Sequence, residues 1–198
     1  VLTVAMDVSD PEQCLALFVK AEQEFGSVDV LVNNAGMHSR GNLETISPAD
    51  VGAMVDINIR APLMLSCAAI PYLRRAGGGG IVMVGSLAGM APLQGAATYS
   101  GTKAGLRAFA YALADEMQGT GIHVGVVSPG PIDTGFIMDE IDNVEDIVFS
   151  QPMSSAAEVA DAVSRLAAGA ILEITMSASS GGRVLLAYSF PFLRRYLR

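Results

Sequence analysis

The chain has 198 residues, of which 51% are hydrophobic and 16% charged, and its formal net charge is -8 at pH 7. This composition excludes a disordered chain, and we expect a single domain over residues 1–198 with a hydrophobic core. The acidic balance also argues against a nucleic-acid partner, because phosphate backbones are bound by clustered Lys and Arg side chains.

The cysteines and histidines favour a reduced compartment and no metal. Cys14 and Cys67 lie far apart without a CxxC motif, which is typical of a cytoplasmic protein. Neither His38 nor His123 has a partner at metal-ligand spacing. The longest apolar stretches fall short of the roughly 20 residues that cross a bilayer.

The first part of the chain predicts strand, helix and strand. An apolar run at 2–6 indicates a strand, and the sequence SDPE at 9–12 indicates a capping box with proline in the first turn of a helix. That helix should end before Gly26. A short Val-rich strand at 28–32 then leads into the turn-prone sequence NNAG at 33–36.

The middle of the chain continues the alternation. It predicts a helix at 48–75 with an irregularity at Pro62, a strand at 81–84, a helix at 98–117 and a strand at 123–127. The glycines at 77–80 lack the later glycine of GxGxxG, so a plain turn is favoured over a phosphate loop.

The last part of the chain predicts a long loop at 128–153, a helix at 156–168 and a β-like run at 183–187. Strands that alternate with helices at this spacing predict an α/β fold, a doubly wound parallel sheet with helices on both faces. Ligands of such sheets bind at the carboxyl ends of the strands.

Three residues form the sharpest candidate site. Tyr99 and Lys103 are spaced i, i+4 on one predicted helix and so share a face, and Ser86 follows a neighbouring strand. A nearby ammonium favours the phenolate and lowers the pKa of a phenol from about 10 toward the working range. Tyr99 would then exchange a proton with a substrate oxygen to which Ser86 also donates a hydrogen bond.

Together with the NNAG turn, Asp7-Val8, Asn58 and the sequence PGPIDT at 129–134, these residues resemble the short-chain dehydrogenase/reductase family over nearly the whole chain. The resemblance implies a Rossmann-type homo-oligomer that uses NAD or NADP to interconvert a secondary alcohol and a ketone. The helices at 48–75 and 98–117 are the expected surface between subunits.

The resemblance also implies roles for these residues. Tyr99 would be the general acid/base, Ser86 would polarise the carbonyl, and Lys103 would lower the Tyr99 pKa and hold the nicotinamide ribose. Asn58 would hold a water that passes protons to solvent, unless it merely caps or kinks its helix. The expected cofactor contacts are Asp7, Val8, Asn34, Ala35, Gly36, Tyr99, Lys103, Pro129, Gly130, Ile132 and Thr134. Asn33 and Asp133 are expected to be structural, and Gly36 to take positive φ.

Two features depart from the family pattern. The glycine-rich TGxxxGxG turn is missing, so we expect an N-terminally truncated Rossmann domain with uncovered apolar edges. As an isolated piece it should bind dinucleotide poorly and be inactive. The aromatic and basic tail at 188–198 would cover the substrate pocket, contact another subunit or, as a less favoured alternative, touch a membrane.

Other functions stay open beside the oxidoreductase. The missing phosphate turn leaves a non-catalytic dinucleotide-binding or interaction module as an alternative. A serine hydrolase that uses Ser86 is disfavoured, because GSLAG at 85–89 is not a GxSxG elbow. The loop at 135–153 mixes apolar and acidic residues, which favours an apolar-lined lid and an uncharged, fairly apolar small-molecule substrate.

Overall fold

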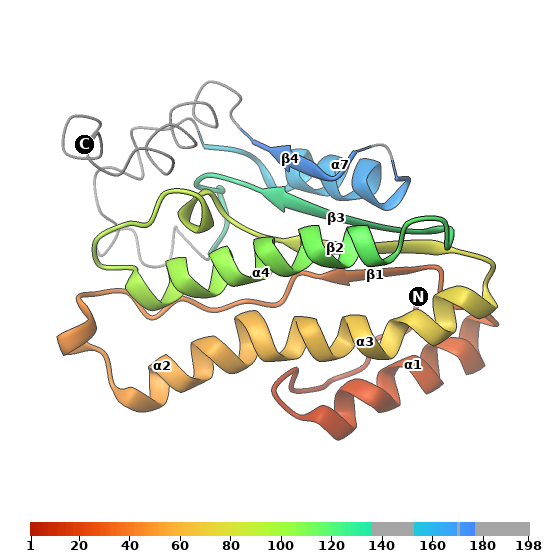
Figure 1. Ribbon diagram of the computed structural model, residues 1–198. Coiled ribbons are helices and arrows are strands. Elements are labelled where there is room, and N and C mark those ends of the chain that lie inside the picture. Colours follow the sequence, from red (N-terminus) through yellow and green to blue (C-terminus); the bar gives the residue numbers. More distant parts are fainter. Residues whose placement is uncertain (136–152, 170, 177–198) are drawn as a thin grey trace.

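The computed structural model describes residues 1–135, 153–169 and 171–176. Its centre is a parallel sheet in the order β1-β2-β3-β4 (Figure 1). The strands are β1 (Val30–Asn33), β2 (Gly79–Val84), β3 (Ile122–Ser128) and β4 (Glu173–Thr175). Because all three strand pairs are parallel, the carboxyl ends of the strands lie at one edge of the sheet.

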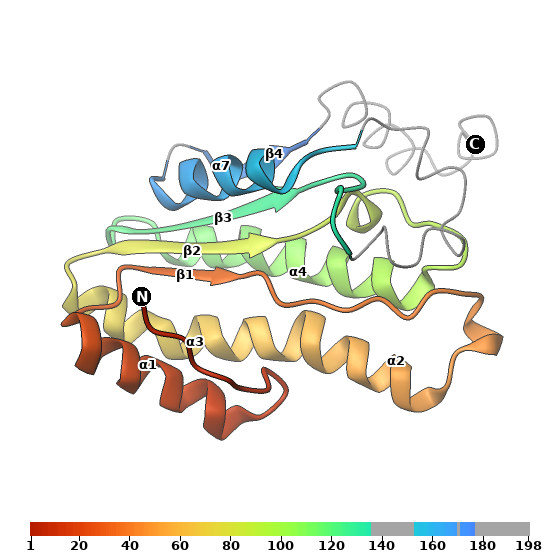
Figure 2. The same cartoon turned by 180° about the vertical axis from the view of Figure 1, so that it is seen from behind.

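Helices cover both faces of this sheet. They are α1 (Pro11–Phe25), α2 (Pro48–Val55), α3 (Ala61–Arg75), α4 (Ala97–Glu116) and α7 (Ala156–Ala167). Helix α4 lies in front of the strands in Figure 1 and behind them in Figure 2. The predicted α/β fold with a parallel sheet and helices on both faces is thereby confirmed.

Successive residues of the strands pack into two separate hydrophobic cores, one on each face of the sheet. On one face Ile81, Met83 and Val126 pack in the cluster that includes residues of α1, α3 and α4. On the other face Val82 and Val127 pack against α7. Side chains that alternate between the faces explain why the centre of β2 is buried on both sides and reads as a continuous apolar run.

The predicted strand at 2–6 is wrong. These residues have no strand conformation, and β1, which begins the strand order, pairs only with β2 among the described residues. An apolar run becomes a strand only where a neighbouring ladder satisfies its backbone. The expected uncovered apolar edge is present at β1, where Val30 and Val32 are 43% and 41% exposed.

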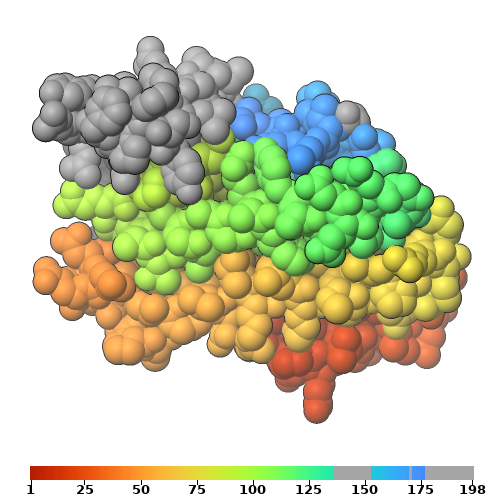
Figure 3. All heavy atoms as spheres, in the orientation of Figure 1, coloured from red at the N-terminus to blue at the C-terminus, as the bar shows by residue number. Residues whose placement is uncertain are grey.

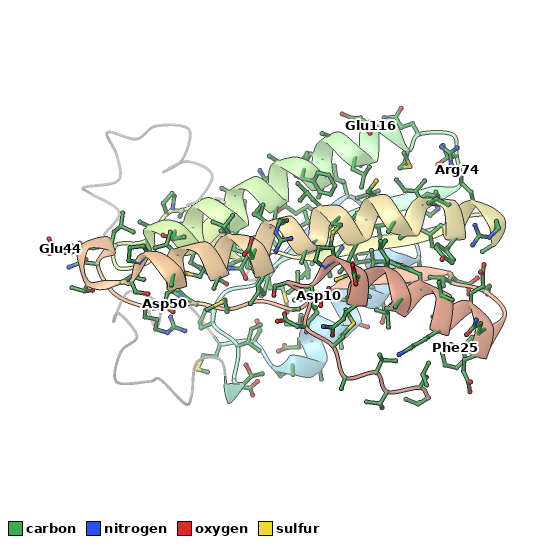
Figure 4. All side chains as sticks on the ribbon, turned by 90° about the horizontal axis from the view of Figure 1, so that it is seen from below. Asp10, Phe25, Glu44, Asp50, Arg74 and Glu116 are labelled. Carbon is green, nitrogen blue, oxygen red and sulfur yellow. The ribbon has the colours of Figure 1, made fainter. Side chains whose placement is uncertain are left out.

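Helix α1 begins one residue later than the predicted capping box. Asp10 is the N-cap, and its carboxylate accepts hydrogen bonds from the backbone N–H groups of Glu12 and Gln13. Ser9 instead donates its backbone N–H to the Asp7 carboxylate. The helix runs from Pro11 to Phe25, next to its N-cap Asp10, which is labelled with Phe25 in Figure 4, and Gly26 ends it in the left-handed conformation with φ of 82°.

The predicted helix at 48–75 is interrupted by a π-helical segment, Asp56–Arg60, between α2 and α3. Ala61 N–H bonds back to the Asp56 carbonyl, five residues earlier. Pro62 has no N–H to offer the Asn58 carbonyl, so the regular ladder fails there. The predicted irregularity is confirmed, but it precedes Pro62.

The glycines at 77–80 form the predicted helix-to-strand turn. Gly77 and Gly78 take φ of 89° and 134°, and β2 begins at Gly79, two residues before the predicted strand. A side chain at Gly79 would overlap the Asp29 carbonyl oxygen, so close approach of the backbone also requires glycine. No part of the turn opens a helix.

Other differences concern the end of the chain. Strand β4 was not predicted, because three residues with a glutamate carry no clear alternation. Its Glu173 is bound by Arg107 of α4 at 2.7 Å, by Tyr111 and by Ser128. The predicted strand at 183–187, most of the predicted loop at 135–153, and the tail at 188–198 lie outside the described residues.

The segment Pro48–Arg75 is long and apolar enough to cross a membrane by length and composition alone. This is weak evidence, because core helices of soluble proteins pass the same test, and α3 packs against α1, β1 and β2 here. Figure 3 shows α4 and the α2–α3 segment side by side on one face of the molecule. These are the helices expected to form a surface between subunits.

Candidate active site

The NNAG turn, Ser86 and the segment that begins at Pro129 gather where β1, β2 and β3 end. Asn33 at the end of β1 pairs with Met83, and Val84 at the end of β2 pairs with Val127. The NNAG turn, Ser86 and Pro129 therefore follow three adjacent strands at the same edge (Figure 1). The fold brings together side chains that are far apart in the sequence.

Ser86 lies two residues after the end of β2, and its side chain reaches helix α4. It caps a short helical turn, Leu87–Gly89, and accepts a hydrogen bond from Ala88 N–H at 3.1 Å. Its side chain also interacts with the phenol of Tyr99 in the first turn of α4, and this interaction lowers the pKa of that phenol. An added Cβ at Gly89 would lie 2.7 Å from the Lys103 carbonyl carbon, so only glycine lets α4 pack directly on this turn.

Lys103 lies one helical turn beyond Tyr99 and is only 5% exposed. Its Nζ donates to the Val84 carbonyl at 2.8 Å and lies 5.7 Å from the centre of the Tyr99 ring. Burial lowers the pKa of Lys103 to about 8. An ammonium has three N–H donors, and Val84 is the acceptor that the described residues provide.

The pKa of Tyr99 does not follow the simple expectation from its spacing to Lys103. Burial raises this pKa above its ordinary value, and the interaction with the Ser86 side chain and the positive charge of Arg40 oppose the rise. Burial is the largest of these effects, because a phenolate loses more hydration than a phenol. Lowering of the Tyr99 pKa by Lys103 therefore stays a prediction.

Asn58 is fully buried and joins three elements. Its Oδ1 accepts from Met37 N–H at 2.9 Å, and its Nδ2 donates to the Met37 carbonyl at 2.9 Å and to Thr102 Oγ1 at 3.2 Å. Both amide N–H groups are thus used inside the protein. The side chain holds the segment after NNAG against α4, and the water-holding role stays a prediction.

We expect Asn58→Ala to lower the free energy of unfolding by about 2–4 kcal/mol, since it removes three hydrogen bonds of a fully buried side chain and leaves Met37 unpaired. Urea denaturation at neutral pH measures the change. Asn42→Ala is the matched control, because Asn42 is exposed and makes no side-chain cap bond. Equal stability of both variants would contradict the clamping role.

The NNAG turn divides into a buried and an exposed part. Asn33 is buried and donates to Ser66 Oγ at 3.2 Å, in agreement with a structural role. Asn34, Ala35 and Gly36 are exposed. The expected positive φ of Gly36 is not found; instead an added Cβ there would lie 3.3 Å from Asn58 Oδ1 and 3.6 Å from Lys103 Nζ.

The remaining predicted cofactor contacts lie in loops. Asp7 is exposed, and its bond from Ser9 N–H lowers the pKa of its carboxyl. Val8 follows it before α1. After β3 come Pro129, whose carbonyl accepts from Leu87 N–H at 2.9 Å, and Gly130. Ile132 bridges to Ser154, and Thr134 N–H donates to the Ile132 carbonyl at 2.8 Å. Asp133 is exposed in the same turn.

One residue at the site, His38, was missed by the sequence reasoning. Its imidazole stacks on the Tyr99 ring with centres 4.2 Å apart and planes 16° apart. Burial and the charge of Arg40 lower the pKa of His38 to about 4. The one available signal was its place two residues after Gly36. The described residues contain no group of three His, Cys, Asp or Glu that could hold a metal ion.

Comparison with known proteins places this arrangement in a family. A family model described as short chain dehydrogenase matches residues 1–145. The chain belongs to the short-chain dehydrogenase family. The sequence resemblance that led to the same family is thereby confirmed, and the matched region includes Ser86, Tyr99 and Lys103.

Several curated short-chain dehydrogenase relatives are oxidoreductases by name. An uncharacterized oxidoreductase of Staphylococcus saprophyticus is 36% identical over 130 residues, which are 65% of this chain and 53% of the relative. The ketoacyl reductase HetN of Nostoc is 34% identical over 70% of this chain and 48% of the relative. The chain thus spans about half the length of these two relatives.

The 3-oxoacyl-[acyl-carrier-protein] reductase FabG of Escherichia coli is 32% identical over 174 residues, or 86% of this chain and 71% of the relative. Among solved structures, a gluconate 5-dehydrogenase from Burkholderia cenocepacia in complex with NADP and tartrate matches with a TM-score of 0.78 at 22% identity. That match covers 86% of this chain and 71% of the other. The ligand-free aldohexose dehydrogenase of Thermoplasma acidophilum matches with a TM-score of 0.76 at 26% identity, over 87% of this chain and 76% of the other.

Proposed function

We propose that this protein is an NAD(P)-dependent oxidoreductase that interconverts a secondary alcohol and a ketone, with Tyr99 as the general acid/base. The observation that carries the proposal is that the Tyr99 phenol interacts with the Ser86 side chain beside the buried amine of Lys103. A pure binding protein has little need of a phenol, a hydroxyl and an ammonium in one place. The names of the relatives, which are reductases and dehydrogenases, support the same reaction class.

The residues present fit the nicotinamide end of a dinucleotide. Lys103 has N–H donors beyond the one that Val84 accepts, which suits a pair of ribose hydroxyls. The exposed backbone of Gly36 lies beside this amine and lets a ligand approach closely. Asp7 offers an exposed carboxylate for the adenine end. The turn that would cradle the pyrophosphate is not among the 198 residues.

When bound, the dinucleotide supplies or accepts the hydride. In ketone reduction the Tyr99 hydroxyl donates its proton to the substrate oxygen, and the hydroxyl of Ser86 donates a hydrogen bond to the same atom. The ammonium of Lys103 stabilises the phenolate that results. In alcohol oxidation Tyr99 accepts the proton instead.

The substrate is proposed to be an uncharged, fairly apolar ketone or alcohol. Two relatives, by their names, reduce ketoacyl compounds, and this chemistry suits a site whose proton donor is a neutral phenol. We further propose a cytoplasmic homo-oligomer that uses the face of α2, α3 and α4 shown in Figure 3.

We expect the longest natural form of the protein that carries these residues to consume NADH or NADPH only when a ketone is added. A ketone panel with absorbance at the reduced-nicotinamide band measures turnover, and cofactor fluorescence measures binding. Binding of the cofactor without turnover of any ketone or alcohol would instead favour a non-catalytic dinucleotide-binding module. Assay of residues 1–198 alone tests whether this piece is inactive.

A further inference from the structure

His38 is in direct contact with the proposed acid/base. Its imidazole lies flat against the phenol of Tyr99, with ring centres 4.2 Å apart. A substrate whose oxygen reaches the Tyr99 hydroxyl therefore lies beside this imidazole. The residue is well placed to influence which ketones are accepted.

The backbone on both sides of His38 is held in place. Met37 is bound through both its N–H and its carbonyl by Asn58. Gly41 N–H donates to the Gly95 carbonyl at 3.0 Å, which ties the segment to the loop before α4. A side chain between two such anchors is preorganised for contact with a ligand.

The Nε2 atom of His38 is buried and has no hydrogen-bond partner within the described residues. Proteins pair nearly all buried polar atoms, and an exception at a functional site calls for an explanation. The imidazole is neutral at physiological pH, because burial and Arg40 lower its pKa to about 4. A neutral imidazole nitrogen pairs well with an uncharged hydroxyl or carbonyl group.

We propose that His38 is a specificity-determining residue whose Nε2 pairs with a second uncharged polar group that the substrate carries close to the reacting carbonyl. The inference rests on the proposed function and narrows its substrate class. Ketones with a neighbouring oxygen are preferred over plain ketones, because only they satisfy the buried nitrogen.

The test compares ethyl 3-oxohexanoate with 4-nonanone, which have the same chain length and differ in the ester group. The kcat/KM ratio of the two ketones is measured for the wild type and for His38→Phe, which keeps a flat ring against Tyr99 and removes the nitrogen. We expect the preference for the keto ester to fall about tenfold in this variant. The kcat/KM of the keto ester should fall, and that of 4-nonanone should stay the same. His123→Phe is the control, since His123 is exposed at the opposite end of β3.

Comparing ratios cancels the intrinsic difference in reactivity between the two ketones. An unchanged ratio in His38→Phe would overturn the inference, even if both kcat/KM values fall. It would show that His38 only supports the Tyr99 ring, and the proposed function would stand. A wild type that turns over neither these ketones nor any other ketone or alcohol would overturn the proposed function itself. Dinucleotide affinity, measured by fluorescence, should be the same in all variants.

Discussion

The Tyr99→Phe variant is expected to lower kcat by about 10²–10⁴-fold, the range that general acid/base catalysis contributes. Phenylalanine keeps the ring that stacks on His38 and removes only the hydroxyl, whose pKa the Ser86 side chain influences. Dinucleotide affinity should therefore stay close to that of the wild type. Steady-state kinetics and a cofactor fluorescence titration measure the two quantities.

Tyr111→Phe is the matched control for this variant. Tyr111 lies on the same helix, but its hydroxyl pairs with Glu173 at 2.6 Å. We expect its kcat to be unchanged. A Tyr99→Phe variant with wild-type turnover, or an equal loss in both variants, would disprove the assigned role.

The same role predicts the pH dependence of the wild type. Ketone reduction needs a protonated Tyr99, and burial raises the pKa of this phenol. The reduction rate should therefore be constant near neutral pH and fall only at alkaline pH, as the phenol loses its proton. Lys103, with a pKa of about 8, also loses its charge at alkaline pH. In Tyr99→Phe only the part of the fall that belongs to the phenol should therefore be absent.

The Lys103→Met variant is expected to lose at least about 100-fold in kcat and, unlike the wild type, to show little gain in stability at alkaline pH. In the folded protein burial lowers the pKa of Lys103 from 10.5 to about 8. The folded state thus binds a proton less tightly than the unfolded chain does. Between these two pKa values, stability rises with pH, and below about pH 8 the buried ammonium costs its full penalty.

Urea denaturation at pH 7 and at pH 10 measures how the free energy of unfolding depends on pH. The wild type should gain about 2 kcal/mol more in the free energy of unfolding than Lys103→Met between these values. Lys20→Met is the control, since Lys20 is exposed on α1 and its removal should leave the wild-type pH dependence intact. If the stability of Lys103→Met depended on pH as the wild type does, the Lys103 amine would not be buried away from water.

Much of the site could be predicted because its signals are local. The i, i+4 spacing of Tyr99 and Lys103 fixes their shared helix face, and alternating strands and helices fix the edge at which Ser86 and the NNAG turn meet. These inferences need no knowledge of which helix packs on which.

The parts that were missed depend on long-range contacts. The partners of Asn58 follow from the π-helical segment and from Thr102 on another helix. The stack of His38 on Tyr99 joins residues that are 61 positions apart in the sequence. The run at 2–6 has the composition of a strand, but a strand also needs a partner, and composition alone does not supply one.

The contact between Gly89 and the backbone of Lys103 has a wider consequence. With no side chain between them, the turn that carries Ser86 and the helix that carries Tyr99 and Lys103 have no room to shift separately. The three reactive groups form one rigid unit with a fixed geometry. A change of substrate would then come from substitutions in the residues around this unit, while Ser86, Tyr99 and Lys103 keep the same geometry.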